Sequence, residues 1–276
     1  MRPDPKVSVS VPMYNGADHI GECIESVLRQ TLTDFELVLV DDASTDGTVE
    51  IARSFEDDRI RIIENPNQLG AEGNWNAALH HSRGEYVKVL SHDDVIYERC
   101  LERQAAVLDS DPELAWVAVR RDIIDGESRI LVRDRGLGEL SGRMETPEVF
   151  HTLIRSGTNI FGEGAAVLLR RNAAVSAGGF DGRRGYVIDL DLWIRLLLTG
   201  PAYALDETLA VFRVSRGQWS VSLARHQARQ VRELFAELRT KPGLSVGRLD
   251  AAVGWVRAGW MAWLRRLAYL VIRLRR

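Results

Sequence analysis

The sequence predicts an α/β domain with a predominantly parallel central sheet, followed by a C-terminal helical extension. Between Lys6 and Asp94, apolar strand-like runs alternate with segments of helical periodicity. The runs are apolar almost throughout, as expected for strands that are covered on both faces. Two of these runs end in adjacent carboxylates, and the carboxyl ends of the strands are where open α/β sheets bind ligands.

The elements follow one another in a regular order. Period-two alternation ending at Pro12 predicts the first strand, and apolar residues recurring every three or four positions predict the first helix. In chain order we expect strands over residues 6–13, 35–40, 59–64, 87–94, 115–124 and 203–212, with helices over 17–30, from about 48, and over 72–82, 100–109 and from 188. Residues 125–145 carry many glycines and charges without clear periodicity, so we expect a mobile connection there.

Composition limits the kinds of protein that this chain represents. With 276 residues and 45% hydrophobic content, the chain has ample material for one large domain and an appendage. Cys23 and Cys100 lie far apart and belong to no Cys-x-x-Cys pair, which argues against a disulfide framework or a zinc site. The first six residues lack the apolar core of a signal peptide. We therefore expect a protein of the reducing cytoplasm, with a domain over residues 1–220 and a helical tail over 221–276.

Two acid pairs at strand ends are the candidate functional residues. Asp93 and Asp94 repel one another unless they are solvated or share a cation, and a hard divalent ion held with substrate phosphates is a common solution. A solvated loop is the alternative for such a pair alone. Asp42 follows another strand and is suited to accept a hydrogen bond from a ligand N–H such as that of a pyrimidine. Either Ser44 or Asp46 is expected to cap the helix that begins near Thr48.

Seven short motifs occur together in a particular order. They are Ser8-Val-Ser-Val-Pro-Met-Tyr-Asn15, Val40-Asp-Asp-Ala-Ser-Thr-Asp-Gly-Thr48, Gly73-Asn-Trp-Asn76, Arg83-Gly-Glu-Tyr86, His92-Asp-Asp94, Gly178-Gly-Phe-Asp181 and Asp189-Leu-Asp-Leu-Trp193. With them the sequence resembles the family 2 glycosyltransferases from about Lys6 to Ser220. The resemblance implies the GT-A fold, a Rossmann-like nucleotide-binding α/β domain, and inverting transfer of a sugar from a nucleotide diphosphate donor.

The resemblance also implies roles for individual residues on the donor side. Pro12, Tyr14 and Asp42 are expected to hold the nucleotide base, which we expect to be uridine or deoxythymidine. Asp93 is expected at the ribose or the metal. Asp94 is expected to bind the metal, Mn²⁺ or Mg²⁺, that bridges the diphosphate.

On the acceptor side, the resemblance implies that Asp189 is the general base. The family commonly has an acid at the position of Ser91 and Glu at the position of Ile188, so Asp191 is a second candidate base. These two departures also keep open a catalytically degenerate module that binds nucleotide or serves as a scaffold in glycan assembly. A nucleotidyltransferase is less well supported, because residues 12–16 lack the Gly-rich, basic first loop of that class.

The segment after the last predicted strand bears on the acceptor. Arg213, followed by Gln218-Trp219-Ser220, resembles the acceptor-side arginine segment of non-processive family members. It does not reproduce the Gln-x-x-Arg-Trp motif of polysaccharide synthases. We therefore expect transfer of one sugar per encounter, to a lipid-linked or surface-glycan acceptor.

The tail has a charge and periodicity unlike the rest of the chain. Residues 241–276 carry a net charge of +7, which leaves −10 for residues 1–240. Ten apolar residues fall on one face of a helix: Leu249, Ala252, Val253, Val256, Trp260, Trp263, Leu267, Leu270, Val271 and Leu274. The interleaved arginines disfavour a membrane span and favour a helix lying on an anionic membrane surface. Packing on the domain or in a dimer is the alternative, and the acidic body argues against nucleic acid. We expect a peripheral location on the inner face of the cell membrane.

Overall fold

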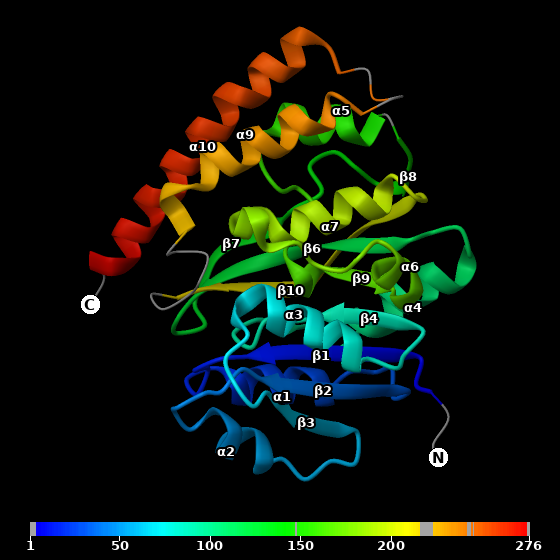
Figure 1. Cartoon of the computed structure of the whole chain (residues 1–276), viewed down its shortest axis with the longest axis vertical. Helices are drawn as coiled ribbons and strands as arrows, with labels where there is room; N and C mark the ends of the chain where they lie inside the picture. The colour runs from blue at the N-terminus through cyan, green and yellow to red at the C-terminus, as the bar shows by residue number, and fades with distance from the viewer. Residues whose placement is uncertain (1–3, 147, 216–222, 242–243, 245, 275–276) are drawn as a thin grey trace.

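A single ten-stranded sheet organises the chain in the computed structural model (Figure 1). The structure describes residues 4–146, 148–215, 223–241, 244 and 246–274. For residues 224 and 268–274 it describes the backbone only. The strands are β1 (Val7–Met13), β2 (Phe35–Asp41), β3 (Ile60–Glu64), β4 (Tyr86–Val89), β5 (Val95–Ile96), β6 (Trp116–Asp125), β7 (Ile130–Arg135), β8 (Gly142–Met144), β9 (Val167–Arg170) and β10 (Ala202–Val214).

The helices cover the sheet and extend beyond it. They are α1 (Ile20–Leu28), α2 (Thr48–Arg53), α3 (Gly70–His81), α4 (Cys100–Ser110), α5 (Glu148–Ser156), α6 (Arg171–Ser176), α7 (Ile188–Leu197), α9 (Gln227–Leu238) and α10 (Arg248–Leu274), with short 3-10 turns η1 (Gly164–Ala166), η2 (Gly182–Val187) and η3 (Leu223–Arg225). The alternation of strands and helices in the first hundred residues is as the sequence predicts.

The sheet order explains where a ligand binds. The order is β3-β2-β1-β4-β9-β6-β10-β5, in which β3, β2, β1 and β4 are mutually parallel and β6 is parallel to β10. The chain moves outward from β1 through β2 to β3 and then returns to place β4 on the other side of β1. This reversal opens a crevice beyond the carboxyl ends of β1, β2 and β4. One acid of each strand-end pair, Asp42 and Asp93, lies there.

The second half of the sheet contains antiparallel strands. β9 runs antiparallel to both β4 and β6, and so joins the two parallel groups. β5 and β8 pair antiparallel with β10. The α/β class with a mostly parallel sheet is therefore confirmed, with these additions at the centre and the edges.

The expected mobile connection over 125–145 is wrong. β7 pairs with β6, with Arg121 opposite Arg135, and β8 pairs with β10. All six residues of β7 are exposed, including Ile130 and Val132. Such a strand has no buried face, so it lacks the apolar alternation by which a strand is predicted from sequence.

The tail helices lie against the end of the domain that is remote from β3 and α2 (Figure 1). α10 meets α5 through small residues, since a Cβ on Gly254 would lie 2.0 Å from the carbonyl oxygen of Ile154, and Ala258 and Ala262 are buried. The apolar residues Val256, Trp260 and Trp263 instead point outward and are 62%, 57% and 53% exposed. None of the helices in the described part of the chain has the length and apolar content that a bilayer span requires.

Candidate active site

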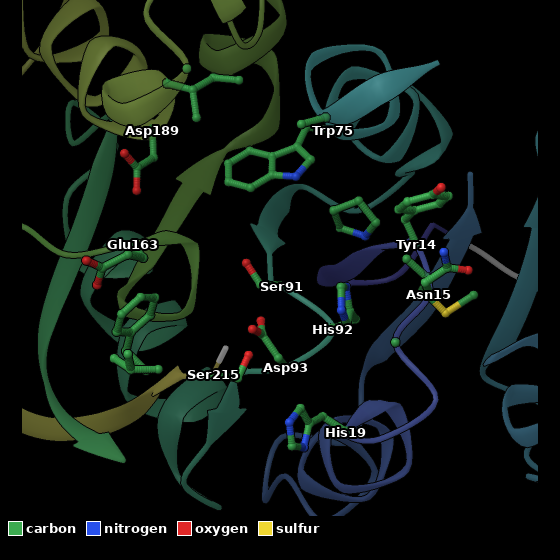
Figure 2. A pocket seen from close by; sticks show the side chains of 18 of the residues that line it. Tyr14, Asn15, His19, Trp75, Ser91, His92, Asp93, Glu163, Asp189 and Ser215 are labelled. Carbon is green, nitrogen blue, oxygen red and sulfur yellow. The ribbon is translucent and has the colours of Figure 1, made fainter. Parts of the chain in front are cut away.

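A cleft of about 1150 Å³ lies beyond the carboxyl ends of β1, β2 and β4. Figure 2 shows Asp189 and Glu163 on one side of it, Tyr14 and Asn15 on the other, and Asp93 between them. Seven carboxylates and two arginines line it. A cleft with this excess of negative charge is suited to a ligand that brings a cation.

The loops after β1 and β2 form one end of the cleft. Pro12, Tyr14 and Asp42 all line it, so three of the residues expected at the nucleotide base are brought together. Asp42 is buried and accepts hydrogen bonds from the backbone N–H groups of Leu69 (2.7 Å) and Gly70 (2.9 Å). These bonds fix the loop that leads into α3, so Asp42 has a structural role as well as a place in the cleft.

The two asparagines of the Gly73-Asn-Trp-Asn76 motif, on α3, connect the elements that form this end of the cleft. Asn74 donates to the carbonyl oxygens of Met13 and Val40, at the ends of β1 and β2. Asn76 bonds both backbone groups of Phe180. Trp75, between them, lines the cleft and packs edge-on against the Phe180 ring with centroids 5.1 Å apart. The motif therefore aligns the cleft wall.

The loop after β2 is capped as the sequence predicts. Asp46 accepts a hydrogen bond from the backbone N–H of Thr48, the first residue of α2, and another from Ala17. Ser44 instead accepts from the backbone N–H of Asn15. Both side chains tie the β1 and β2 loops together and contribute structure.

The two acids after β4 lie in different environments, and this corrects the expectation for Asp94. Asp93 lines the cleft, whereas Asp94 is fully buried beneath it and is absent from the cleft wall. One Asp94 oxygen accepts the backbone N–H of Arg213 at 2.9 Å, and the other has no hydrogen-bond partner among the described residues. Burial, and then the charge of Asp93, raises the pKa of Asp94 well above its ordinary value. Asp94 is therefore unsuited to be the ligand for a metal in the cleft.

Arg213 supports the acid turn from behind, which corrects its expected place on the acceptor side. Its side chain is completely buried and donates to the carbonyl oxygens of Asp93 (2.8 Å) and Asp125 (3.2 Å). It also forms an ion pair with Glu22 at 2.5 Å. The Gln218-Trp219-Ser220 part of the same resemblance lies outside the described residues.

Asp189 and Asp191 are separated by the geometry of α7. Asp189, in the first turn, lines the cleft, and its carboxylate accepts the backbone N–H of Leu190 at 2.7 Å. Asp191 is bonded to Arg195 at 2.7 Å and does not belong to the cleft wall. Of the two candidate bases, Asp189 is therefore the one that α7 presents to the cleft. Burial, with a smaller contribution from Glu163, raises the pKa of Asp189 to about 7.

Glu163 is a cleft residue that the sequence interpretation missed. It lines the cleft, lies near enough to Asp189 to raise its pKa, and forms an ion pair with the buried Arg121 at 2.5 Å. Its neighbours are glycines for a geometric reason. Gly162 has a φ of +99°, and a Cβ on Gly164 would lie 1.9 Å from the carbonyl oxygen of Val89. The signal available in the sequence was a glutamate between two glycines, Gly162 and Gly164, a pattern that can mark a side chain presented by a tight turn.

A divalent cation fits this cleft only if a bound substrate supplies some of its ligand atoms. Among the described residues, no group of three or more His, Cys, Asp or Glu side chains forms a metal cage. Asp93 is the acid that the turn after β4 presents to the cleft. One carboxylate together with substrate phosphates is a usual arrangement for Mg²⁺, so the donor set fits an ion that arrives with a diphosphate.

Comparisons with known proteins agree with this geometry. A family model described as Glycosyl transferase family 2 matches residues 8–175. The EpsE protein of Bacillus subtilis, a glycosyltransferase by name, is 32% identical over 215 residues, which cover 76% of this chain and 73% of that protein. An uncharacterized protein of Mycobacterium tuberculosis, MT1568, is 29% identical over 276 residues, covering 96% of this chain and 86% of that protein.

Solved structures show the same fold. Residues 1–349 of S. aureus TarS match with a TM-score of 0.67 at 20% identity, covering 91% of this chain and 71% of that one. The mannosyltransferase PcManGT of Pyrobaculum calidifontis matches with a TM-score of 0.62 and covers 98% of this chain and 75% of that one. The GT-A fold follows from these matches together with the observed sheet. The chain belongs to glycosyl transferase family 2, and it is an enzyme of the glycosyltransferase type.

Proposed function

We propose that this enzyme transfers a single sugar, with inversion, from a nucleotide diphosphate sugar to a hydroxyl group of an acceptor. The single observation that carries the proposal is that Asp42, Asp93 and Asp189, from three distant parts of the chain, line one cleft. Its volume, about 1150 Å³, is at the upper end of the range for small-molecule sites, which suits a donor and an acceptor together.

Asp189 is the proposed general base. A base works best when its pKa lies near the working pH, and burial raises the pKa of Asp189 to about 7. Its position on α7, on the side of the cleft opposite Tyr14, supports an acceptor hydroxyl entering between Asp189 and the donor (Figure 2). Asp189 takes the proton as that hydroxyl attacks the sugar, and the diphosphate leaves from the other side. A single displacement of this kind inverts the configuration.

Asp93 is the proposed protein ligand for Mn²⁺ or Mg²⁺. When bound, such an ion neutralises negative charge on the leaving diphosphate. The titles of two fold relatives support both parts of this proposal: TarS was solved with UDP-GlcNAc, and PcManGT with GDP-Man and Mn²⁺. In this chain Asp93 presents its carboxylate to the cleft while Arg213 holds its backbone.

Pro12, Tyr14 and Asp42 are proposed to hold the nucleotide base. Asp42 Oδ2 accepts the Gly70 N–H at 2.9 Å and retains a second lone pair. A pyrimidine N3–H is a donor of the right kind for it, which favours uridine or deoxythymidine. The half-exposed Tyr14 ring offers a surface on which the base stacks.

Helix α10 is proposed to hold the enzyme at an anionic membrane surface, on the inner face of the cell membrane. Its outward face carries Leu249, Val256, Trp260, Trp263 and Leu267, all exposed. Its opposite face is already packed on α5 through small residues. An exposed stripe of tryptophan and aliphatic side chains next to arginines is typical of a helix lying in the headgroup region. A lipid-linked or surface-glycan acceptor agrees with this location.

A thermal-shift screen tests the proposal. Nucleotide sugars with and without Mn²⁺ are expected to raise the melting temperature only when the donor matches, because a ligand stabilises the state to which it binds. Asp93→Asn is expected to remove the Mn²⁺-dependent part of the shift, and Asp189→Asn to retain the shift but lose transfer. Donor binding without transfer to any acceptor extract by the unaltered protein would instead favour the degenerate binding module.

A further inference from the structure

Arg265 differs from the other arginine of the cleft. The described lining residues include two arginines, of which Arg129 forms ion pairs with Asp125 and Glu127, both at 2.9 Å. Arg265 donates to the hydroxyl groups of Tyr186 and Thr158. Among the described residues it has no carboxylate within ion-pair distance. These two neutral hydroxyl groups orient the guanidinium group of Arg265 but do not neutralise its charge.

The orientation of Arg265 comes from the packed face of α10. Gly254, Ala258, Ala262 and Arg265 follow at steps of four, four and three residues, so they lie on one side of the helix. The first three pack against the domain. Arg265 continues this side into the cleft, away from the exposed stripe. The direction of the Arg265 side chain is therefore fixed, because the packed helix holds its backbone and the two hydroxyl groups hold its guanidinium group.

Arg265 lies on the wall that carries Asp189. Tyr186 belongs to η2, three residues before Asp189, and Thr158 follows α5. Tyr14, where the base is proposed to bind, lies across the cleft from Asp189, and Asp93, where the donor phosphates are proposed to bind, lies between them (Figure 2). An anion bound by Arg265 is therefore closer to the incoming hydroxyl than to the nucleotide.

We propose that Arg265 binds a phosphate group of the acceptor, so that the acceptor is a phosphate- or diphosphate-bearing molecule. The inference rests on the proposed sugar transfer and names the acceptor class for the same cleft. Arginine pairs with phosphate through two parallel hydrogen bonds, which positions a substrate as well as attracting it. The phosphate belongs either to a lipid headgroup at the surface that α10 contacts or to a soluble sugar phosphate.

Calorimetric titration of the full chain tests the inference. The probes are farnesyl phosphate and glucose 1-phosphate, with farnesol and glucose as their neutral counterparts. EDTA is included so that no metal bridges a phosphate to Asp93. We expect the phosphate-bearing probe from the correct source to bind about tenfold or more tightly than its neutral counterpart. Tighter binding of farnesyl phosphate identifies a lipid source, and tighter binding of glucose 1-phosphate a soluble one.

Two variants complete the test. Arg265→Gln is expected to weaken the preferred phosphate probe about tenfold, and Arg265→Lys by less, because lysine keeps the charge but not the paired donors. Arg266→Gln is the matched control, since Arg266 is the next residue on the helix and is exposed outside the cleft. An equal affinity of charged and neutral probes, or an equal effect of Arg265→Gln and Arg266→Gln, would overturn the inference.

Failure of the proposed function is measured separately. The Mn²⁺-dependent shift produced by nucleotide sugars reports on the donor side. It is expected to be unchanged in Arg265→Gln, which also shows that the variant is folded. If no nucleotide sugar binds while Arg265→Gln still loses phosphate affinity, the anion site is supported and the proposed sugar transfer is rejected.

Discussion

Replacing Asp189 by asparagine is expected to stabilise the fold at neutral and higher pH while it abolishes transfer. In the folded protein the pKa of Asp189 is about 7, whereas the ordinary value is 3.8. Between these values the folded chain holds a proton that the unfolded chain has lost. The free energy of unfolding therefore falls as the pH rises through this window, and the loss is complete above about pH 7.

The magnitude follows from the size of the shift. One pKa unit corresponds to about 1.4 kcal/mol, so raising the pKa from 3.8 to about 7 costs the ionised protein on the order of 4 kcal/mol. Asparagine removes the charge and keeps an oxygen to accept the Leu190 N–H, now at 2.7 Å. At about 2 to 4 °C per kcal/mol for a chain of this size, the melting temperature is expected to rise by roughly 8 to 16 °C near pH 8.

The assay is thermal unfolding of the protein without nucleotide or metal, over a range from about pH 5 to about pH 8. The gain from Asp189→Asn is expected to shrink by more than half towards the acid end. Asp191→Asn is the matched control on the same helix, because it removes a partly buried ion pair with Arg195 outside the cleft and is expected to give a loss of stability without this pH trend. A gain from Asp189→Asn that is independent of pH, or retained transfer, would refute the reasoning.

Four further outcomes follow from the same site. The kcat/KM of the unaltered enzyme is expected to rise with pH, to reach half its maximum near pH 7 and to level off above it, because Asp189 must be ionised to accept a proton; a flat profile would contradict its proposed role as base. In Asp93→Asn, titration is expected to show loss of Mn²⁺-dependent donor binding. Asp94→Asn is expected to bind donor within about twofold of the unaltered protein, since asparagine keeps the bond to the Arg213 N–H and ionisation there is unfavourable; loss of metal binding would restore Asp94 as a ligand. Arg213→Met removes the donor to the carbonyl oxygens of Asp93 and Asp125 and is expected to cost about 1 to 3 kcal/mol in chemical denaturation, which an unchanged midpoint would exclude.

The parallel part of the fold follows directly from local sequence pattern. Strands covered on both faces are apolar throughout, and each acid pair marks the end of such a strand, so β1, β2 and β4 with their loops are well predicted. The pattern fails at β7, where every side chain is exposed. Backbone pairing with β6 stabilises β7. Such pairing does not impose a pattern of apolar and polar residues on β7, so it cannot be predicted from the sequence of β7 alone.

The site shows a similar division. Asp42, Asp93 and Asp189, all of them candidate residues from the sequence, line one cleft, whereas Asp94 does not. The choice between adjacent acids depends on the direction in which a turn presents each side chain, and the turn after β4 presents Asp93 to the cleft and buries Asp94. Glu163 was missed because its relation to Asp189 arises only when β9 inserts between β4 and β6.

Strand β10 has a consequence for how the enzyme is completed. The β1 to β4 region is contained in the first 89 residues, whereas the support for the acid turn comes from Arg213, more than a hundred positions later. Closing so long a loop is slow, so we expect the ends of β1, β2 and β4 to form early and the turn of Asp93 and Asp94 to be braced late. A shortened polypeptide ending at residue 175, where the family match ends, keeps the early part but lacks both Arg213 and the proposed base, Asp189. Completion of the acid turn therefore depends on the last strand of the sheet.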